Sequence, residues 1–317
     1  MDGSLTVQTG RRKTLKAPIG CVGIGLHSGQ RVSLTLRPAP SGHGIVFRRT
    51  DLGLDLPARY DWVGDTRLCT ALVMPGRPEV RVGTVEHVMA ALSACGIDDV
   101  LIELNGPEVP IMDGSAAPFL FLIDCAGTVE SLEARSRIEV LKTVRVQDGE
   151  GPGAAWAELS PNPTPGLEAQ LAIDFAGTAI GRQTMATLVT ENAFRALLAD
   201  ARTFTLAADI ERLRAAGLAL GGSLSNAVVV DGTTVLNPGG LRHSDEFVRH
   251  KLLDVVGDLA MAGAPLRGRF RGERSGHALN NRLLRALLAD PAAWRWEQND
   301  ALALSVSQPA LRETVAA

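Results

Sequence analysis

The order of strand and helix patterns along this 317-residue chain is the feature that most restricts its fold. Short segments in which apolar and polar residues alternate occur within residues 31–48, and an apolar helix pattern follows at 85–92. The same order of strands followed by a helix recurs in the second half, where strand patterns at 138–175 precede a long helix pattern at 244–262. This grouping favours an α+β fold, with helices on one side of largely antiparallel sheets.

Residues at element ends sharpen these boundaries. Thr84 is expected to cap the helix that starts at Val85, and Gly96 to end it. Pro118 is typical of the first turn of a second helix over 116–125. The polar segment 127–136 is expected to join two domains. Further strands are predicted at 80–82, 99–104, 138–146, 155–159, 167–175 and 227–230, and further helices at 191–198, 208–216 and 280–289.

Composition excludes several classes of protein. Hydrophobic residues make up 45% of the chain and charged residues 21%, a balance typical of folded globular proteins. The net charge of -3 gives no global attraction to nucleic acid, so no nucleic-acid partner is expected. No stretch approaches the roughly 20 apolar residues of a membrane-spanning helix, and the start of the chain lacks a secretory pattern. We therefore expect a cytoplasmic protein without a transmembrane segment.

The helix pattern at 244–262 carries the most chemical information. His250, Asp254 and Asp258 fall one turn apart on one face, with Gly257 beside them and Lys251 at the margin. Residues one turn apart are neighbours, so the histidine and the first aspartate could bind one metal ion. From spacing alone, a solvated charged face is the stronger interpretation. The opposite, apolar face holds Leu252, Leu253, Val255, Val256, Leu259 and Ala260.

A second candidate is the pair Glu86-His87 at the start of the first helix pattern. In isolation the pair is better explained as helix surface, because the helix dipole favours an acidic residue there. A catalytic zinc, however, takes three protein ligands and leaves a fourth position for water. His87 together with His250 and Asp254 would supply three such ligands.

Amide hydrolysis also needs groups that transfer protons. Glu86 could accept the proton of the attacking water, whose pKa a metal lowers. His277, in a turn at 274–277, could protonate the leaving nitrogen. Asp258 could orient His277 and keep it cationic. The segment Gly23–Gly29 lacks the full dinucleotide-binding pattern and is interpreted as a tight turn that presents His27.

Ordered sequence blocks connect these residues to a known family. They include Gly23-Ile-Gly-Leu-His-Ser-Gly29, Thr84-Val-Glu-His-Val88, Ala201-Arg-Thr-Phe204, Gly217-Leu-Ala-Leu-Gly-Gly-Ser223, Asp245-Glu-Phe-Val-Arg-His-Lys-Leu-Leu-Asp254 and Ser275-Gly-His-Ala-Leu-Asn-Asn281. Over about residues 12 to 289, the chain resembles the UDP-3-O-acyl-N-acetylglucosamine deacetylases of lipid A synthesis. The resemblance implies two similar two-layer α/β sandwich domains, residues 1–134 and 135–317, with the active site between them. It also implies a β-α-β insert at about 204–243 that forms an apolar tunnel for an acyl chain.

The resemblance also implies roles for individual residues. One zinc ion would be held by His87, His250 and Asp254, with Glu86 as general base and His277, paired with Asp258, as general acid. Thr203 would stabilise the oxyanion, and Lys251 would lie near the reaction centre. The implied substrate contacts are Phe204 on the sugar, Lys142 and Arg274 near the diphosphate, Leu206 and Leu218 along the tunnel, and His27, Leu68 and Gly222. Ordinary packing of the insert is the alternative for each tunnel residue.

The function implied by the resemblance is zinc-dependent hydrolysis of the N-acetyl group of UDP-3-O-(3-hydroxyacyl)-N-acetylglucosamine, with release of acetate. The expected partner is this small-molecule substrate, and the expected state is a monomer. One alternative is a zinc amidohydrolase that acts on another acylated sugar. A catalytically silent acyl-sugar-binding protein is a third hypothesis, but it would need neither Glu86 nor His277. Two histidines and a carboxylate also accept iron or cobalt.

Overall fold

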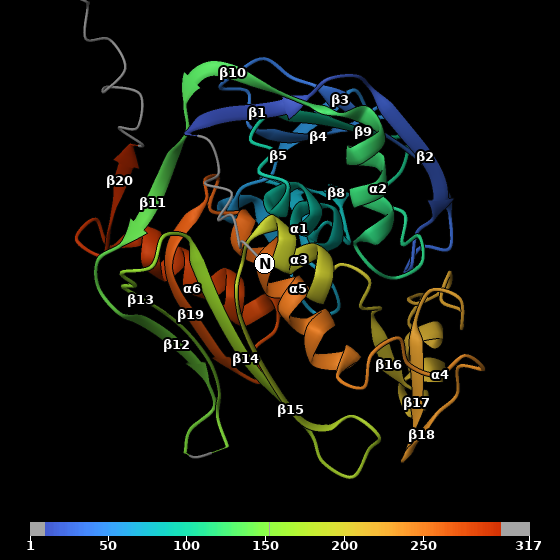
Figure 1. The fold of residues 1–317 in the computed structure, drawn as a ribbon. Helices are drawn as coiled ribbons and strands as arrows, with labels where there is room; N and C mark the ends of the chain where they lie inside the picture. The colour runs from blue at the N-terminus through green and yellow to red at the C-terminus, as the bar shows by residue number, and fades with distance from the viewer. Residues whose placement is uncertain (1–9, 152, 299–317) are drawn as a thin grey trace, which may run out of the picture.

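The computed structural model describes residues 10–151 and 153–298, in which two groups of elements follow one another (Figure 1). In the first group, the longest sheet has the order β2-β3-β9-β4-β5, antiparallel except between β4 and β9. The elements of the first group are β1 (Arg11–Leu15), β2 (Ile19–Ile24), β3 (Arg31–Pro38), β4 (Ile45–Arg49), β5 (Leu54–Pro57), η1 (Tyr60–Trp62), β6 (Val63–Asp65), β7 (Ala71–Met74), β8 (Arg77–Val82), α1 (Glu86–Ala94), β9 (Val100–Leu104), α2 (Ala117–Ala126) and β10 (Thr128–Ala134).

The second group is built on a larger sheet whose central strand is β19. On one side β19 pairs antiparallel with β13, and on the other it pairs in parallel with β14. The elements are β11 (Ser136–Val140), β12 (Val144–Asp148), β13 (Ala155–Ser160), β14 (Leu167–Phe175), β15 (Gly181–Leu188), α3 (Glu191–Leu197), α5 (Glu246–Ala260), β19 (Leu266–Glu273), α6 (His277–Ala289) and β20 (Trp294–Gln298).

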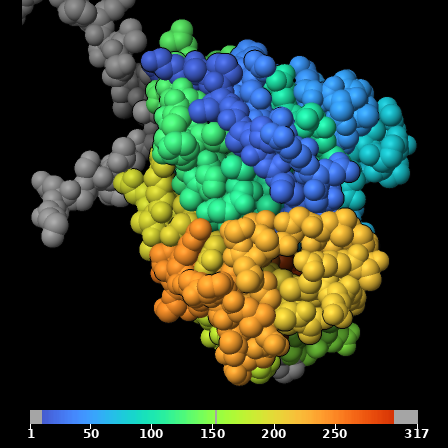
Figure 2. Space-filling view, turned by 90° about the vertical axis from the view of Figure 1, so that its right-hand side faces the viewer, coloured from blue at the N-terminus to red at the C-terminus, as the bar shows by residue number. Residues whose placement is uncertain are grey.

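A small β-α-β unit interrupts the second group between α3 and α5. It consists of β16 (Phe204–Leu206), α4 (Ala207–Ala215), β17 (Val228–Asp231) and β18 (Thr234–Val235), and β16 pairs in parallel with β17. We call residues 204–243 the insert. Figure 2 shows the insert, in yellow to orange, covering the lower part of one face, with a hollow opening within it.

Alternating burial explains why the strands form, and it directs the core inward. In β3, the side chains of Val32, Leu34 and Leu36 are fully buried, while Ser33 between them is exposed and Thr35 is half-buried. In Figure 1, α1 lies between the five-stranded sheet and α5. The two helices at the centre of the molecule therefore bring together the first and the second group. This arrangement confirms the α+β class; the division at residue 134 stays a prediction.

Several predicted boundaries were wrong. Thr84 does not cap α1: its backbone has φ 56°, outside the extended conformation of a helix cap, and its hydroxyl donates to Glu108 Oε1 at 3.0 Å. The predicted strand 138–146 is divided into β11 and β12. The last helix begins at His277 rather than at Asn280.

The segment expected to join two domains forms a strand. Within it, β10 pairs antiparallel with β1, so both ends of the first group lie side by side. Strands β15 and β19 were not predicted from the sequence, and β15 pairs with β14 along its whole length. Among the described residues, no helix combines the length and the apolar character of a membrane-spanning segment.

Candidate active site

The site forms where α1 crosses α5. A Cβ atom added at Gly257 of α5 would lie 2.0 Å from the carbonyl oxygen of Glu86, so any larger residue would force α1 away. This close backbone approach brings His87 of α1 next to the polar face of α5. That face is buried rather than solvated, with exposed fractions of 2% for His250 and 3% for Asp254 and Asp258. The two surface interpretations that spacing favoured are therefore wrong, because Glu86 and His87 are buried as well.

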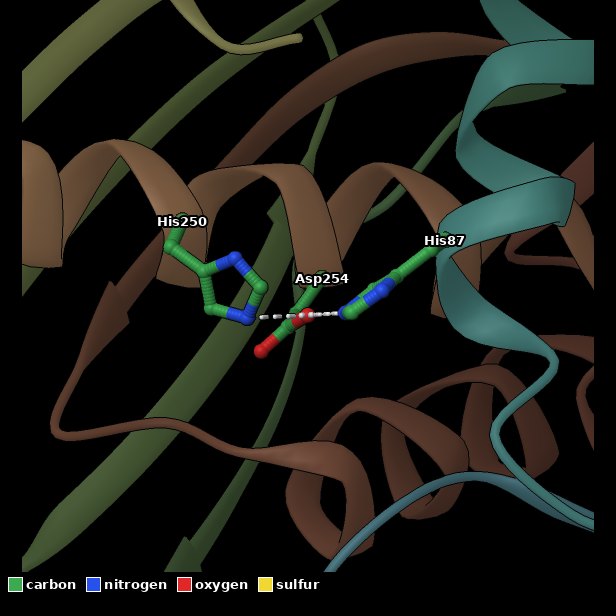
Figure 3. A group of neighbouring side chains, drawn as sticks. All are labelled: His87, His250 and Asp254. Carbon is green, nitrogen blue, oxygen red and sulfur yellow. Dashed lines mark ion pairs between the residues drawn. The ribbon is translucent and has the colours of Figure 1, made fainter. Parts of the chain in front are cut away.

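His87, His250 and Asp254 form a group that can hold a metal ion (Figure 3). Their candidate ligand atoms all lie within 4.8 Å of one another. Oδ1 of Asp254 lies 3.4 Å from Nε2 of His250 and 3.6 Å from Nε2 of His87. This oxygen is buried and has no hydrogen-bond partner in the described part of the chain. A cation between these atoms would satisfy it, and the donor set fits the nitrogen and oxygen ligands of zinc.

The protonation states of these residues suit metal binding. Burial lowers the pKa of His250 to about 4, so its imidazole is neutral at neutral pH. Its Nδ1 donates to the carbonyl oxygen of Ala201 at 3.0 Å, which leaves the lone pair on Nε2, facing Asp254. Burial would raise the pKa of Asp254, but His250 and Lys251 outweigh it and hold that pKa well below its usual range. The Lys251 ammonium donates to Asp254 Oδ2 at 2.9 Å.

The residues predicted to transfer protons lie beside this group in a different environment. Burial raises the pKa of Glu86, as expected of a carboxyl group poised to accept a proton. Burial lowers the pKa of His277, but Asp258 outweighs this effect and raises it to about 9. Nδ1 of His277 lies 2.9 Å from Asp258 Oδ2, and its Nε2 lies 3.9 Å from Asp254 Oδ2. His277 is therefore protonated at neutral pH and directed toward the candidate metal ligands.

Two residues that were not predicted from the sequence contact Glu86 or the partner of His277. The backbone N–H of Thr70 donates to Glu86 Oε2 at 3.0 Å, and its hydroxyl donates to Asp258. Asn280 donates to Asp258 Oδ2 at 2.8 Å. The spacing of His277 and Asn280 on one helix could have revealed the second contact, had the helix start been placed correctly. No sequence pattern marks Thr70.

The candidate metal ligands, Glu86 and His277 line one cavity of about 520 Å³, to which both groups and the insert contribute residues. Its apolar wall includes Leu26, Ile111, Phe175, Leu213 and Leu279, and its cationic side chains include Arg67, Arg212, Lys251 and Arg274. Such a cavity can take a ligand with an apolar part and an anionic part. The predicted site residues that line it are His27, Leu68, Glu86, His87, Thr203, Phe204, Leu206, His250, Lys251, Asp254, Arg274 and His277.

The remaining predicted residues lie outside the cavity lining. Asp258 is buried directly behind His277, with which it pairs. Lys142 is exposed, and its Nζ lies 3.9 Å from Asp290 Oδ2. Gly222 and Leu218 lie in turns of the insert, where their backbone N–H groups donate to Ala219 and Leu213. The structure therefore brings the candidate metal, acid and base residues together, while it places part of the predicted substrate set apart from them.

Phe204 is held in place by other aromatic rings. Its centroid lies 5.1 Å from that of Phe247 and 5.6 Å from that of Phe175, both edge to face. The His250 ring is also close, at 6.3 Å. These contacts fix an apolar surface in the cavity lining, beside the candidate metal ligands.

Comparisons with known proteins give the family to which this sequence is similar. The sequence model of the family described as UDP-3-O-acyl N-acetylglycosamine deacetylase matches residues 12–289. A protein of Idiomarina loihiensis, named UDP-3-O-acyl-N-acetylglucosamine deacetylase, is 49% identical over 290 residues, which cover 90% of this chain and 92% of the relative. A protein of the same name from Shewanella frigidimarina is 47% identical over 287 residues, 89% of this chain and 91% of that one.

Proposed function

Because the chain belongs to the UDP-3-O-acyl N-acetylglycosamine deacetylase family, we propose that it hydrolyses the N-acetyl group of UDP-3-O-(3-hydroxyacyl)-N-acetylglucosamine. The products would be acetate and the free amine, in a step of lipid A biosynthesis. The observation that carries this proposal is the buried Asp254 Oδ1, which lies between two imidazoles and has no hydrogen-bond partner among the described residues. A buried Glu86 and a cationic His277 line the same cavity.

His87, His250 and Asp254 would hold a zinc ion. When bound there, the ion supplies Lewis-acid chemistry, which lowers the pKa of water and polarises the amide carbonyl. The carboxylate of Glu86 accepts the proton of the attacking water. Nε2 of His277 then donates a proton to the nitrogen that leaves, because Asp258 keeps the ring cationic and oriented.

Charged and polar groups around the cavity would stabilise and orient the substrate. The ammonium of Lys251 and the hydroxyl of Thr203 stabilise the negative charge that develops on the amide oxygen. Phe204 packs on the sugar ring, and Arg274 binds the diphosphate, joined by Lys142 from outside the cavity lining. We further propose that Leu206 and Leu218 contact the acyl chain and that His27, Leu68 and Gly222 complete the substrate contacts.

The same proposal includes the organisation of the protein. Residues 1–134 and 135–317 would form two domains with the site between them; residues 1–9 and 299–317 lie outside the described residues. We also propose that the protein acts as a cytoplasmic monomer. Light scattering of purified protein at working concentration tests the monomer, and fractionation of cells tests the location.

An assay of acetate release tests the reaction directly. Purified protein is incubated with UDP-3-O-acyl-N-acetylglucosamine, before and after removal of metal with a chelator and after addition of zinc. We expect release of acetate that the chelator abolishes and zinc restores. UDP-N-acetylglucosamine without the acyl chain serves as the matched control and should react far more slowly. Equal release in the chelated and the zinc-loaded protein would contradict the proposal.

A further inference from the structure

Glu246, the first residue of α5, is fully buried and binds both ends of the insert. At the entry, its Oε1 accepts hydrogen bonds from the backbone N–H and Nε of Arg202, at 3.0 and 2.9 Å. At the exit, its Oε2 accepts one from the backbone N–H of Arg242 at 2.7 Å. Nη2 of Arg202 spans the same gap, because it donates to Oε2 at 3.1 Å and to the carbonyl oxygen of Gly240 at 2.8 Å. One ion pair thus holds the insert where it leaves and rejoins the second group.

The pair is costly to bury and must be complete to be tolerated. Burial alone would raise the pKa of Glu246, but the hydrogen bonds from Arg202 and Arg242 outweigh it and hold that pKa below its usual value. A buried ionised carboxylate needs such partners, since the loss of one of them leaves an uncompensated charge. Apolar residues of similar volume could fill the same space without this cost. The arrangement of the pair therefore calls for a reason other than packing.

That reason lies one residue from Arg202. The carbonyl oxygen of Ala201 accepts the 3.0 Å hydrogen bond from Nδ1 of His250, one helical turn beyond Glu246. The guanidinium and backbone N–H of Arg202 fix the peptide that follows this carbonyl. A partner of this kind on a metal-binding histidine sets its tautomer and its ring orientation. Arg202 and Ala201 thus connect Glu246 to His250 through hydrogen bonds and one peptide bond, in addition to the helix that both residues share.

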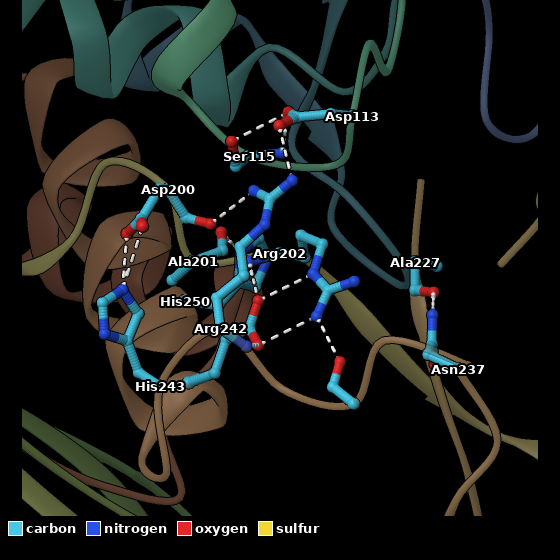
Figure 4. Close-up of polar contacts among 12 residues, drawn as sticks. Asp113, Ser115, Asp200, Ala201, Arg202, Ala227, Asn237, Arg242, His243 and His250 are labelled. Carbon is cyan, nitrogen blue, oxygen red and sulfur yellow. Dashed lines mark hydrogen bonds and ion pairs between the residues drawn. The ribbon is translucent and has the colours of Figure 1, made fainter. Parts of the chain in front are cut away.

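The hydrogen bonds continue to the first group of elements (Figure 4). Nη1 of Arg242 donates to the carbonyl oxygen of Asp200 at 2.7 Å, and its Nη2 donates to Asp113 Oδ2 at 3.0 Å. On the other side of Arg202, the backbone N–H of Thr203 donates to the carbonyl oxygen of Gly114 at 2.8 Å. Residues 200–203 are therefore held from three directions, at the point where they face the candidate metal site.

We propose that the Arg202–Glu246 ion pair positions His250: it fixes the Ala201 carbonyl and thereby sets the orientation of the imidazole in the metal site. Arg202 and Glu246 are positioning residues that contact neither metal nor substrate. This inference rests on the proposed zinc site. It adds that residues at the base of the insert set the orientation of one zinc ligand.

Zinc affinity of purified, folded protein provides the test, measured by competition with a chelator. In Glu246→Gln the side chain keeps its shape but turns an N–H toward the donors of Arg202. In Arg202→Lys the charge remains and the forked donation is lost. We expect each variant to bind zinc about 10- to 100-fold more weakly than the unaltered protein, the usual effect of losing an outer partner of a ligand. After cobalt substitution, the visible absorption spectrum should also change.

Asp99→Asn is the matched control. Asp99 is 1% exposed and accepts from Nε and Nη2 of Arg12, at 2.9 and 2.6 Å, and from the backbone N–H of Gly44, at 2.8 Å. This variant should lose thermal stability but keep the zinc affinity and the cobalt spectrum. If Glu246→Gln and Arg202→Lys keep the zinc affinity and the cobalt spectrum of the unaltered protein, the inference is overturned. If Glu246→Gln does not fold, the result for Arg202→Lys decides alone. Absence of zinc binding by the unaltered protein would instead refute the proposed function.

Discussion

His250 and His277 lie on either side of Asp254, and both are buried, yet their environments give them opposite charges. The pKa of His250 is lowered to about 4, and that of His277 is raised to about 9. The neutral ring donates to a backbone carbonyl, whereas the cationic ring donates to the carboxylate of Asp258. Burial alone would make both rings neutral, so the partner at Nδ1 separates the candidate metal ligand from the proposed acid.

The largest effect is expected when the candidate metal ligand His250 is removed. In His250→Ala, only two candidate ligands remain, so we expect the purified protein to lose stoichiometric zinc. Turnover should fall on the order of 10⁴-fold, because the metal supplies several kcal/mol of transition-state stabilisation. Metal analysis after dialysis measures the first effect. His43→Ala is the control and should retain zinc, because His43 lies in a loop where its Nδ1 is 3.1 Å from the carbonyl oxygen of the adjacent Gly44.

A second variant separates metal binding from proton transfer. Glu86→Ala leaves all three candidate ligands in place and removes the proposed base. We expect it to bind zinc normally and to lose about 10³-fold in turnover, within the usual range for general base catalysis. Metal content and acetate release are measured on the same preparation. Turnover equal to that of Glu79→Ala, which removes an exposed glutamate, would show that the base is misassigned.

Asp258→Asn would make the two histidines more alike. The pKa of His277 should fall toward its usual value near 6.5, because the variant loses the negative charge that raises it to about 9. Since the acid must be protonated, the unaltered protein should lose activity as the pH rises through about 9, and the variant at a lower pH. Turnover at neutral pH should fall about 10²-fold. A pH–rate profile with the same alkaline limit in both proteins would contradict this assignment.

The same raised pKa predicts how stability depends on pH. A group whose pKa is higher in the folded state stabilises that state fully below its unfolded value, near 6.5, and loses this contribution as the pH rises through about 9. The difference in unfolding free energy between the unaltered protein and Asp258→Asn should therefore be largest below pH 6.5 and should shrink toward pH 9. Denaturant titrations across this pH range measure it.

The smallest expected effect concerns Thr70, which supports the acid side only through Asp258. Thr70→Val removes the hydroxyl donor but keeps the backbone N–H that binds Glu86. We expect a loss of about 1.5–3 kcal/mol in unfolding free energy, the usual contribution of a hydrogen bond to a charged group. The alkaline limit of the pH–rate profile should move slightly. Thr70→Ser restores the hydroxyl and should recover most of both properties.

The sequence allowed the residues of α5 to be predicted better than their surroundings. The one-turn spacing of His250, Asp254 and Asp258 follows from helix geometry, which is local. Their burial does not, because it depends on α1, which packs against the bare surface at Gly257 from a distant part of the chain. For this reason spacing favoured a solvated face, and the resemblance to a family was needed to join His87 to the ligands.

The errors in the fold have similar local and long-range causes. Threonine is a residue type that favours helix caps. Thr84 does not cap α1, however, because its φ is positive and its hydroxyl donates to Glu108. The polar sequence of β10 looks like a linker, since it pairs at the surface with β1 and buries few side chains. Thr70 carries no periodic signal at all, because its hydrogen bonds are made to residues that are distant in the sequence, Glu86 in the first group and Asp258 in the second.

The contact of α1 with α5 at Gly257 has a consequence for how a long substrate enters. Enzymes built from two lobes often admit their substrates by hinge closure. Here the two groups of elements cannot separate without pulling His87 away from Asp254, because the backbones of α1 and α5 touch at the centre of the site. The insert is less constrained beyond its anchored base, because α4 contains no buried residue. We therefore expect an acyl chain to enter through local movements of α4. The rate of entry would not depend on movement of α1 against α5.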